Sequence, residues 1–251
     1  MSAVVRTILA KHAEDNGYSI DKGDSAGWAI FEAHATRSRL ALLSNEDGSF
    51  CLGTSHAGVG AELERLLPNS SEMHDGFHCF SVGSSSELFR MIGRVWYLSK
   101  SLPTEPLSEF QRLLEKEESK TEVERLRKER IGQGVFRAAL LDYWENSCAV
   151  TGVTNKTLLR ASHIIPWAKC DTDAERLNAH NGILLVATLD AAFDDGLISF
   201  DDDGKIMISS ELSERDRLDA GIHSDMRLKN LNDKIRQRLL WHRENWFRPR
   251  S

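Results

Sequence analysis

The chain has 251 residues, of which 41% are hydrophobic and 28% charged, and its formal net charge is −6 at pH 7. At roughly 100–200 residues per domain, this length predicts one large or two small domains, and the apolar content excludes a mainly disordered chain. No stretch approaches ~20 consecutive apolar residues, and no small-residue cleavage site follows the first apolar run. The sequence therefore predicts a cytoplasmic protein without a membrane span or a signal peptide.

Residues 1–105 are predicted to form a mixed α+β domain. Apolar periodicity and turn residues predict an antiparallel meander followed by a helix with a capping box at Ser84 and Glu87. The expected strands are 28–35, 39–43, 50–53 and 77–82, and the expected helices are 4–13, 61–67 and 87–101. This part resembles no known family, and we interpret it as a recognition or regulatory domain.

Residues 106–130 are rich in charge and in strong helix formers, which predicts a solvated helical connector, broken near Ser119. The domain that follows, 131–251, alternates short elements. They are a helix at 135–144, strands at 158–165 and 182–186, a brief helix at 189–193, a hairpin at 197–208 and a basic helix at 227–246. The predicted fold class is α+β.

Charge is divided unevenly along the second half of the chain. Residues 161–226 carry 14 acidic and 5 basic residues, whereas residues 227–251 carry 2 acidic and 8 basic residues. We interpret the acidic block and the basic tail as separate features. An acidic cluster beside a basic arm suits a site that holds a cation and faces a polyanion, although a solvated loop and a solvated helix would give the same pattern.

The four cysteines contain no C-x-x-C pair, which argues against a disulfide scaffold and favours reduced thiols. We expect no structural zinc, because Thr151 stands where a second cysteine of a zinc knuckle beginning at Cys148 would be.

Chemistry is concentrated between residues 158 and 196. His163 lies in a strand-like run, Asn181 directly precedes the next apolar run, and Asp190 and Asp194 follow it. On a helix, residues four apart lie on one face, so the two carboxylates repel each other unless a cation lies between them. The spacing therefore indicates a divalent-cation site.

Five short motifs surround these residues, and together they resemble the HNH nuclease family, with its ββα-metal fold, over residues 131–212. The motifs are Arg130-Ile-Gly-Gln133, Cys148-Ala-Val-Thr-Gly152, Ala161-Ser-His-Ile-Ile-Pro-Trp167, Asn181-Gly-Ile-Leu-Leu185 and Phe193-Asp-Asp-Gly-Leu-Ile-Ser199. The resemblance is closest to a restriction-endonuclease-like subgroup.

The resemblance implies a role for each residue. His163 would be the general base, and Asn181 would either hold the loop that orients it or give an oxygen to the metal. Asp190 and Asp194 would bind one metal ion, with Ser162 at the position where the family often has a further ligand. Because both helix positions are aspartate, the cofactor is expected to be Mg²⁺ or Mn²⁺ rather than Zn²⁺. The product would carry a 5′-phosphate.

The implied partner is DNA, either modified or recognised at a specific site, and the implied setting is restriction-modification or defence. Arg160, Lys169, Arg176 and His180 are the candidates for nucleic-acid contact, because they are close in sequence to the motif. Cleavage of both strands would suit a homodimer.

Two other functions are weighed against the endonuclease. One is a catalytically inactive nucleic-acid-binding protein with a degenerate site, in which Ser162 marks the lost ligand. The other is a non-haem iron oxygenase, which is disfavoured because that facial triad needs two histidines and residues 158–196 contain no H-x-D or H-x-E.

Overall fold

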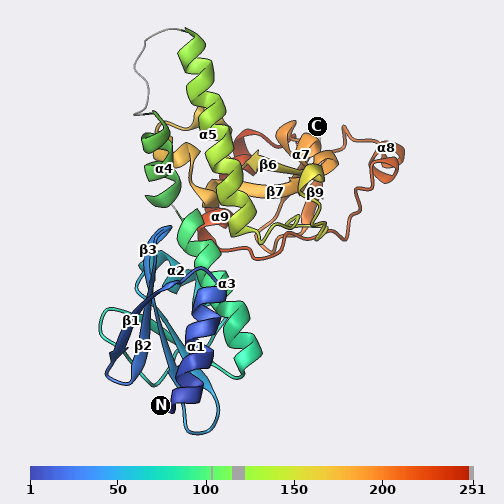
Figure 1. Ribbon diagram of the computed structural model, residues 1–251. Coiled ribbons are helices and arrows are strands. Elements are labelled where there is room, and N and C mark those ends of the chain that lie inside the picture. Colours follow the sequence, from blue (N-terminus) through green and yellow to red (C-terminus); the bar gives the residue numbers. More distant parts are fainter. Residues whose placement is uncertain (103, 115–121, 249–251) are drawn as a thin grey trace. The chain divides into compact units, whose positions relative to one another are not determined.

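The computed structural model describes residues 1–102, 104–114 and 122–248, and the chain divides into two compact units, Met1–Glu105 and Pro106–Ser251 (Figure 1). The predicted α+β class is confirmed. The expected break near Ser119 lies outside the described residues. Within the parts of the chain described here, no helix combines the length and the apolar character needed to cross a membrane.

The first unit is built on a five-stranded antiparallel sheet in which each strand pairs with the next along the chain. The strands are β1 (Ile20–Ser25), β2 (Trp28–Ala33), β3 (Thr36–Ser44), β4 (Phe50–Thr54) and β5 (His78–Val82). Three helices accompany the sheet, namely α1 (Ala3–Asp15), α2 (Ala57–Leu63) and α3 (Ser85–Ser101). The predicted meander is confirmed, with β1 as an additional edge strand.

One helix of this unit differs from the prediction. We expected a helix at 61–67, but α2 begins at Ala57 and ends at Leu63. Its N-cap is His56, whose side chain accepts a hydrogen bond from the Val59 backbone N–H at 3.3 Å. This satisfies one of the free N–H groups that every helix start exposes, so the helix starts earlier than its apolar pattern suggests.

After α4 (Thr104–Leu114), which begins at the end of the first unit, the described part of the second unit contains a long α5 (Glu122–Tyr143) and two small two-stranded sheets. The prediction of a connector that ends at 130 and a separate helix from 135 is wrong, because α5 runs without interruption through both. The remaining elements are β6 (Leu159–His163), α6 (Asp173–Arg176), β7 (Gly182–Val186), α7 (Ala187–Asp194), β8 (Ile198–Phe200), β9 (Ile206–Ile208), α8 (Glu214–Asp219) and α9 (Asp233–Asn245).

The core of this unit forms where α5 and α7 contact the β6–β7 pair (Figure 1). Phe136 and Leu140 of α5 are fully buried against Gly182, the first residue of β7. Any β-carbon at Gly182 would overlap both side chains, so the absence of a side chain lets the helix approach the strand. The Trp144 indole N–H donates to the Gly182 carbonyl at 3.2 Å and holds the contact in register.

The acidic block and the basic tail are joined in the structure rather than separate. Arg243 of α9 forms an ion pair with Asp202 at 2.6 Å and donates to the Phe200 carbonyl at 2.9 Å. Arg248 pairs with Glu211 at 3.1 Å. The expectation of a basic helix beginning at 227 is also wrong, because α9 begins at Asp233 behind an asparagine N-cap.

Candidate active site

The candidate site lies where two strands and a helix meet. β6 and β7 are antiparallel, with His163 directly opposite Gly182, and α7 follows β7 without a loop. Asp190 and Asp194 both lie on α7. Ser162, the penultimate residue of β6, is buried, and its hydroxyl donates to Asp190 Oδ1, which ties the strand to the helix. The segment therefore forms a ββα unit.

The imidazole of His163 is held on three sides. It stacks on Phe136 with ring centroids 3.8 Å apart and meets the edge of Trp167 at 5.7 Å. Its Nε2 lies 2.9 Å from the carbonyl oxygen of Arg176. Because a carbonyl can only accept a hydrogen bond, Nε2 carries the proton and Nδ1 keeps its lone pair. Burial lowers the pKa of His163 to about 4, so the ring is neutral at pH 7.

Asn181 fastens the loop that leaves β6. Its Oδ1 accepts from the Ile165 N–H at 2.9 Å, and its Nδ2 donates to the Ile165 carbonyl at 3.1 Å and to Cys170 Sγ at 3.4 Å. The side chain is buried, and its amide is committed to this loop. Of the two predicted roles, these hydrogen bonds support the positioning of His163 rather than an oxygen given to a metal.

The two carboxylates of α7 have perturbed acidity. Burial raises the pKa of Asp190, while the Ser162 hydrogen bond and the charge of Arg160 lower it, and the net direction is upward. Loss of surrounding water, followed by the negative charges of Asp190 and Asp195, raises the pKa of Asp194 to about 6, although the residue is exposed at the surface. The effect of Asp190 on the pKa of Asp194 indicates that the two carboxylates are close enough to repel each other.

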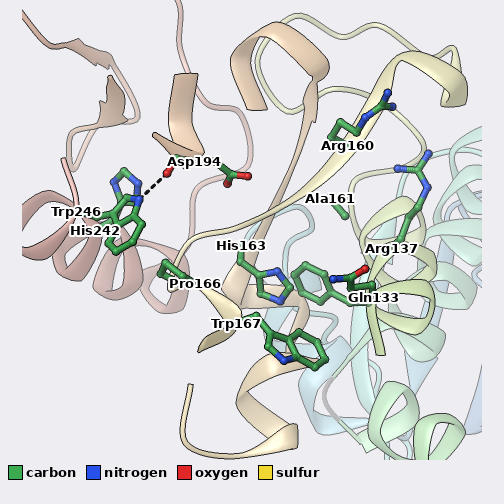
Figure 2. A pocket seen from close by; sticks show the side chains of 11 residues that line it. Gln133, Arg137, Arg160, Ala161, His163, Pro166, Trp167, Asp194, His242 and Trp246 are labelled. Carbon is green, nitrogen blue, oxygen red and sulfur yellow. Dashed lines mark hydrogen bonds between the residues drawn. The ribbon is translucent and has the colours of Figure 1, made fainter. Parts of the chain in front are cut away.

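A cavity of about 490 Å³ opens beside these residues. Figure 2 shows His163 in its centre, with Arg137 and Arg160 at one end and Asp194 and Trp246 at the other. Trp246 is the residue that directly follows α9, and its indole N–H donates to the Asp194 carbonyl at 2.6 Å. The complete lining is Gln133, Phe136, Arg137, Arg160, Ala161, His163, Pro166, Trp167, Asp194, His242 and Trp246.

The four predicted nucleic-acid contacts fall into different places. Arg160 lines the cavity, and Lys169 is exposed at the end of a single 3₁₀ turn, Trp167–Lys169. Arg176 is a structural residue instead, because its guanidinium donates to the carbonyls of Trp167 and Cys170 and pairs with Asp173 at 3.1 Å. His180 is only 1% exposed and packs against Tyr143, so its side chain is buried and not placed for the predicted nucleic-acid contact.

Sequence reasoning missed several lining residues that come from distant elements. Gln133 belongs to the Arg130–Gln133 motif, whose Gly132 leaves room for the Trp167 ring against α5. Trp167 follows the His-Ile-Ile-Pro run, so both motifs contained a usable signal. Arg137 and Trp246 carry no local signal.

The described residues contain no group of three His, Cys, Asp or Glu side chains that could enclose a metal ion by themselves. The available donor set is the two carboxylates of α7, with the Ser162 hydroxyl beside one of them. Mg²⁺ commonly keeps several water ligands and binds through one or two carboxylates together with substrate phosphate. Two hard carboxylate donors, of which Asp194 lines the cavity, therefore fit Mg²⁺ or Mn²⁺.

Comparison with known families finds a match in the second unit. Residues 148–201, which include β6, β7 and α7, match the family model described as HNH endonuclease, and the predicted resemblance of the C-terminal half is thereby confirmed. The match indicates nuclease activity on a nucleic-acid substrate. No curated protein matches the chain.

Proposed function

We propose that the unit containing this HNH endonuclease segment is a metal-dependent DNA endonuclease, with His163 as general base and one Mg²⁺ or Mn²⁺ bound by Asp190 and Asp194. The observation that carries the proposal is the hydrogen bond from His163 Nε2 to the Arg176 carbonyl. It commits one ring nitrogen to the backbone and leaves Nδ1 as a proton acceptor in the cavity that Asp194 also lines.

In this reaction His163 Nδ1 removes a proton from a water molecule, whose oxygen then bonds to phosphorus as the bond to the 3′ oxygen breaks. The negative charge of the phosphate favours the imidazolium that forms. A divalent ion, when bound, would neutralise the phosphate and stabilise the departing oxygen. The cleaved strand would then end in a 5′-phosphate.

The surrounding residues keep the base in one orientation. Phe136 stacks on one face of the imidazole, Trp167 makes a T-shaped contact with it, and the hydrogen bond to the Arg176 carbonyl fixes the tautomer. The loop after β6 is itself held by side chains. The guanidinium of Arg176 donates to the Trp167 carbonyl, and the amide oxygen of Asn181 accepts from the Ile165 N–H. Ser162 orients Asp190 by donating a hydrogen bond to Oδ1, and the second carboxylate oxygen remains for a metal.

The test is nicking of supercoiled plasmid in Mg²⁺ or Mn²⁺, with EDTA as the metal-free control and with both plain and modified DNA. We expect cleavage by the wild type, a loss of at least about a hundredfold in His163→Ala, and no loss in His223→Ala, an exposed histidine of the same unit. Equal nicking by His163→Ala would remove His163 as the base. Binding of DNA without cleavage in every metal would favour the inactive nucleic-acid-binding protein.

A role in restriction or defence, with residues 1–105 as the recognition or regulatory part, belongs to the same proposal, as does a homodimer that cuts both strands. The plasmid product tests the dimer. If a dimer cuts both strands, linear DNA should appear early and in proportion to the dimer population measured by sedimentation. Accumulation of nicked circles alone by a monomer would contradict it.

A further inference from the structure

Two guanidinium groups converge on one backbone carbonyl at the end of the cavity. Arg137 of α5 donates from Nη1 to the Leu159 oxygen at 2.8 Å and from Nη2 to the Lys156 oxygen at 2.8 Å. Arg160 of β6 donates from Nη1 to the same Leu159 oxygen at 3.0 Å and to the Thr157 oxygen at 2.9 Å. The two Nη1 atoms are therefore within about 6 Å of each other.

This pair keeps its positive charge. Over the part of the chain that the structure describes, neither guanidinium has a carboxylate within ion-pair distance, whereas Arg176, Arg236 and Arg243 of the same unit each pair with an aspartate. Arg160 lowers the pKa of Asp190 through its charge, but does so from beyond contact distance. Two like charges held together by neutral carbonyls repel each other, and an anion between them would relieve this repulsion.

The remaining donors are available to a ligand. A guanidinium has five N–H groups, and the backbone contacts use two from each arginine. Both residues line the cavity, and Arg160 is exposed. Figure 2 places their guanidinium groups beyond His163, at the end of the cavity opposite Asp194. An anion bound there would lie beside the phosphate that faces His163, not in its place.

We propose that Arg137 and Arg160 together bind one backbone phosphate of the nucleic-acid strand, adjacent to the phosphate that is cleaved. The proposal rests on the proposed function for the identity of the polyanion. Planar guanidinium groups match the oxygen geometry of a phosphate, and their fixed backbone anchors keep the site formed before the strand arrives. In this proposal Arg137 is a substrate-binding residue, and Arg160 binds the same phosphate together with it.

The experiment measures binding rather than cleavage. A short fluorescein-labelled DNA duplex of mixed sequence is titrated with the full chain in EDTA, and fluorescence anisotropy gives the association constant across a KCl series. The variants are Arg137→Gln, Arg160→Gln and the double variant. The matched control is Arg215→Gln, which removes an exposed arginine of α8 that does not line the cavity.

We expect each single substitution to weaken binding, and the double variant to lower the slope of log K against log [KCl] by about one, the change for one neutralised phosphate. The control should leave the slope unchanged. Arg137→Lys keeps the charge and should keep most of the slope, which separates a phosphate contact from a purely structural role. Circular dichroism checks that each variant is folded.

Three results would overturn the proposal: a slope that the double variant leaves unchanged, a fall of about two, which would mean two separate phosphates, or no DNA binding by the wild type at any salt concentration. Because EDTA excludes cleavage, failure of the plasmid assay would not affect this measurement. Conversely, an unchanged slope together with normal nicking would remove the arginine pair and leave the proposed function intact.

Discussion

Replacement of Gly182 by alanine tests the contact on which the orientation of His163 depends. A β-carbon built at this position lies 2.5 Å from the tip of the Phe136 ring and 2.6 Å from a methyl group of Leu140. Non-bonded carbon atoms prefer about 3.5–4.0 Å, so the overlap is about 1 Å on two side chains at once. Phe136 is 1% exposed and Leu140 is 0% exposed, and neither can move into solvent.

Overpacking of a well-filled core typically costs about 1–3 kcal/mol, and two immobile neighbours place this substitution in the upper part of that range. With a urea slope of about 2–3 kcal/mol per M, we expect the midpoint of the second unit to fall by about 1 M. Phe136 stacks on His163 at 3.8 Å, so displacement of its ring should also tilt the imidazole and reduce plasmid nicking.

Urea unfolding monitored by tryptophan fluorescence and by circular dichroism measures the effect, with the two units resolved as separate transitions where they do not coincide. Gly134→Ala is the matched control. Gly134 lies in α5, the helix that packs against Gly182, but a β-carbon there meets nothing within 4 Å, so alanine should stabilise the helix by about 0.5–1 kcal/mol. A Gly182→Ala protein as stable and active as the wild type would refute the tight contact between α5 and β7.

Two further predictions concern pH and metal binding. Because the pKa of Asp194 is about 6 without metal, protons compete with Mn²⁺ for this carboxylate below pH 6. Calorimetry should therefore show the affinity for Mn²⁺ falling up to tenfold per pH unit. Equal Mn²⁺ affinity at pH 7 and pH 5, or unchanged Mn²⁺ affinity in Asp194→Asn, would remove this residue from the proposed ligands. Burial also lowers the pKa of His163 and of His242 to about 4. Between pH 6.5 and pH 4 the unfolded chain therefore binds more protons than the folded chain does. As the pH falls through this range, each histidine should lower the unfolding free energy by about 1.4 kcal/mol per pH unit. Urea titrations at pH 7 and pH 5 measure this loss of unfolding free energy. His242→Gln should remove about half of it, whereas His223→Gln, at the surface, should leave it unchanged. An equal loss of unfolding free energy in the two variants would contradict the low pKa of His242.

The elements around the site are largely predictable because their signals are local. Residues 182–186 form a short apolar run between an asparagine and a helix, and the Asp201–Gly204 turn separates two strands, so pattern and structure agree there. β1 is missed because Ile20–Ser25 is almost entirely exposed and polar, and only its pairing with β2 makes it a strand. The continuity of α5 is missed because Gly132 and Gly134 weaken its helical pattern.

The site itself is predictable only in part. Spacing along one helix places Asp190 and Asp194 together, but Arg137 contacts a carbonyl 22 residues away, and Trp246 contacts one 52 residues away. Such pairs depend on how the elements pack, and no period of 2 or 3.6 residues reports them. The same reason explains His180, which is next to Asn181 in sequence but is buried in contact with Tyr143.

The pairing of Arg236 and Arg243 of α9, and of Arg248 beyond it, with aspartate and glutamate side chains has an electrostatic consequence. Asp233, Asp202 and Glu211 offset the charges that Arg236, Arg243 and Arg248 would otherwise present to a polyanion. These three arginines therefore contribute little to the long-range attraction of a nucleic acid, and the attraction depends on cations without a nearby carboxylate among the described residues, such as Arg137 and Arg160 in the cavity.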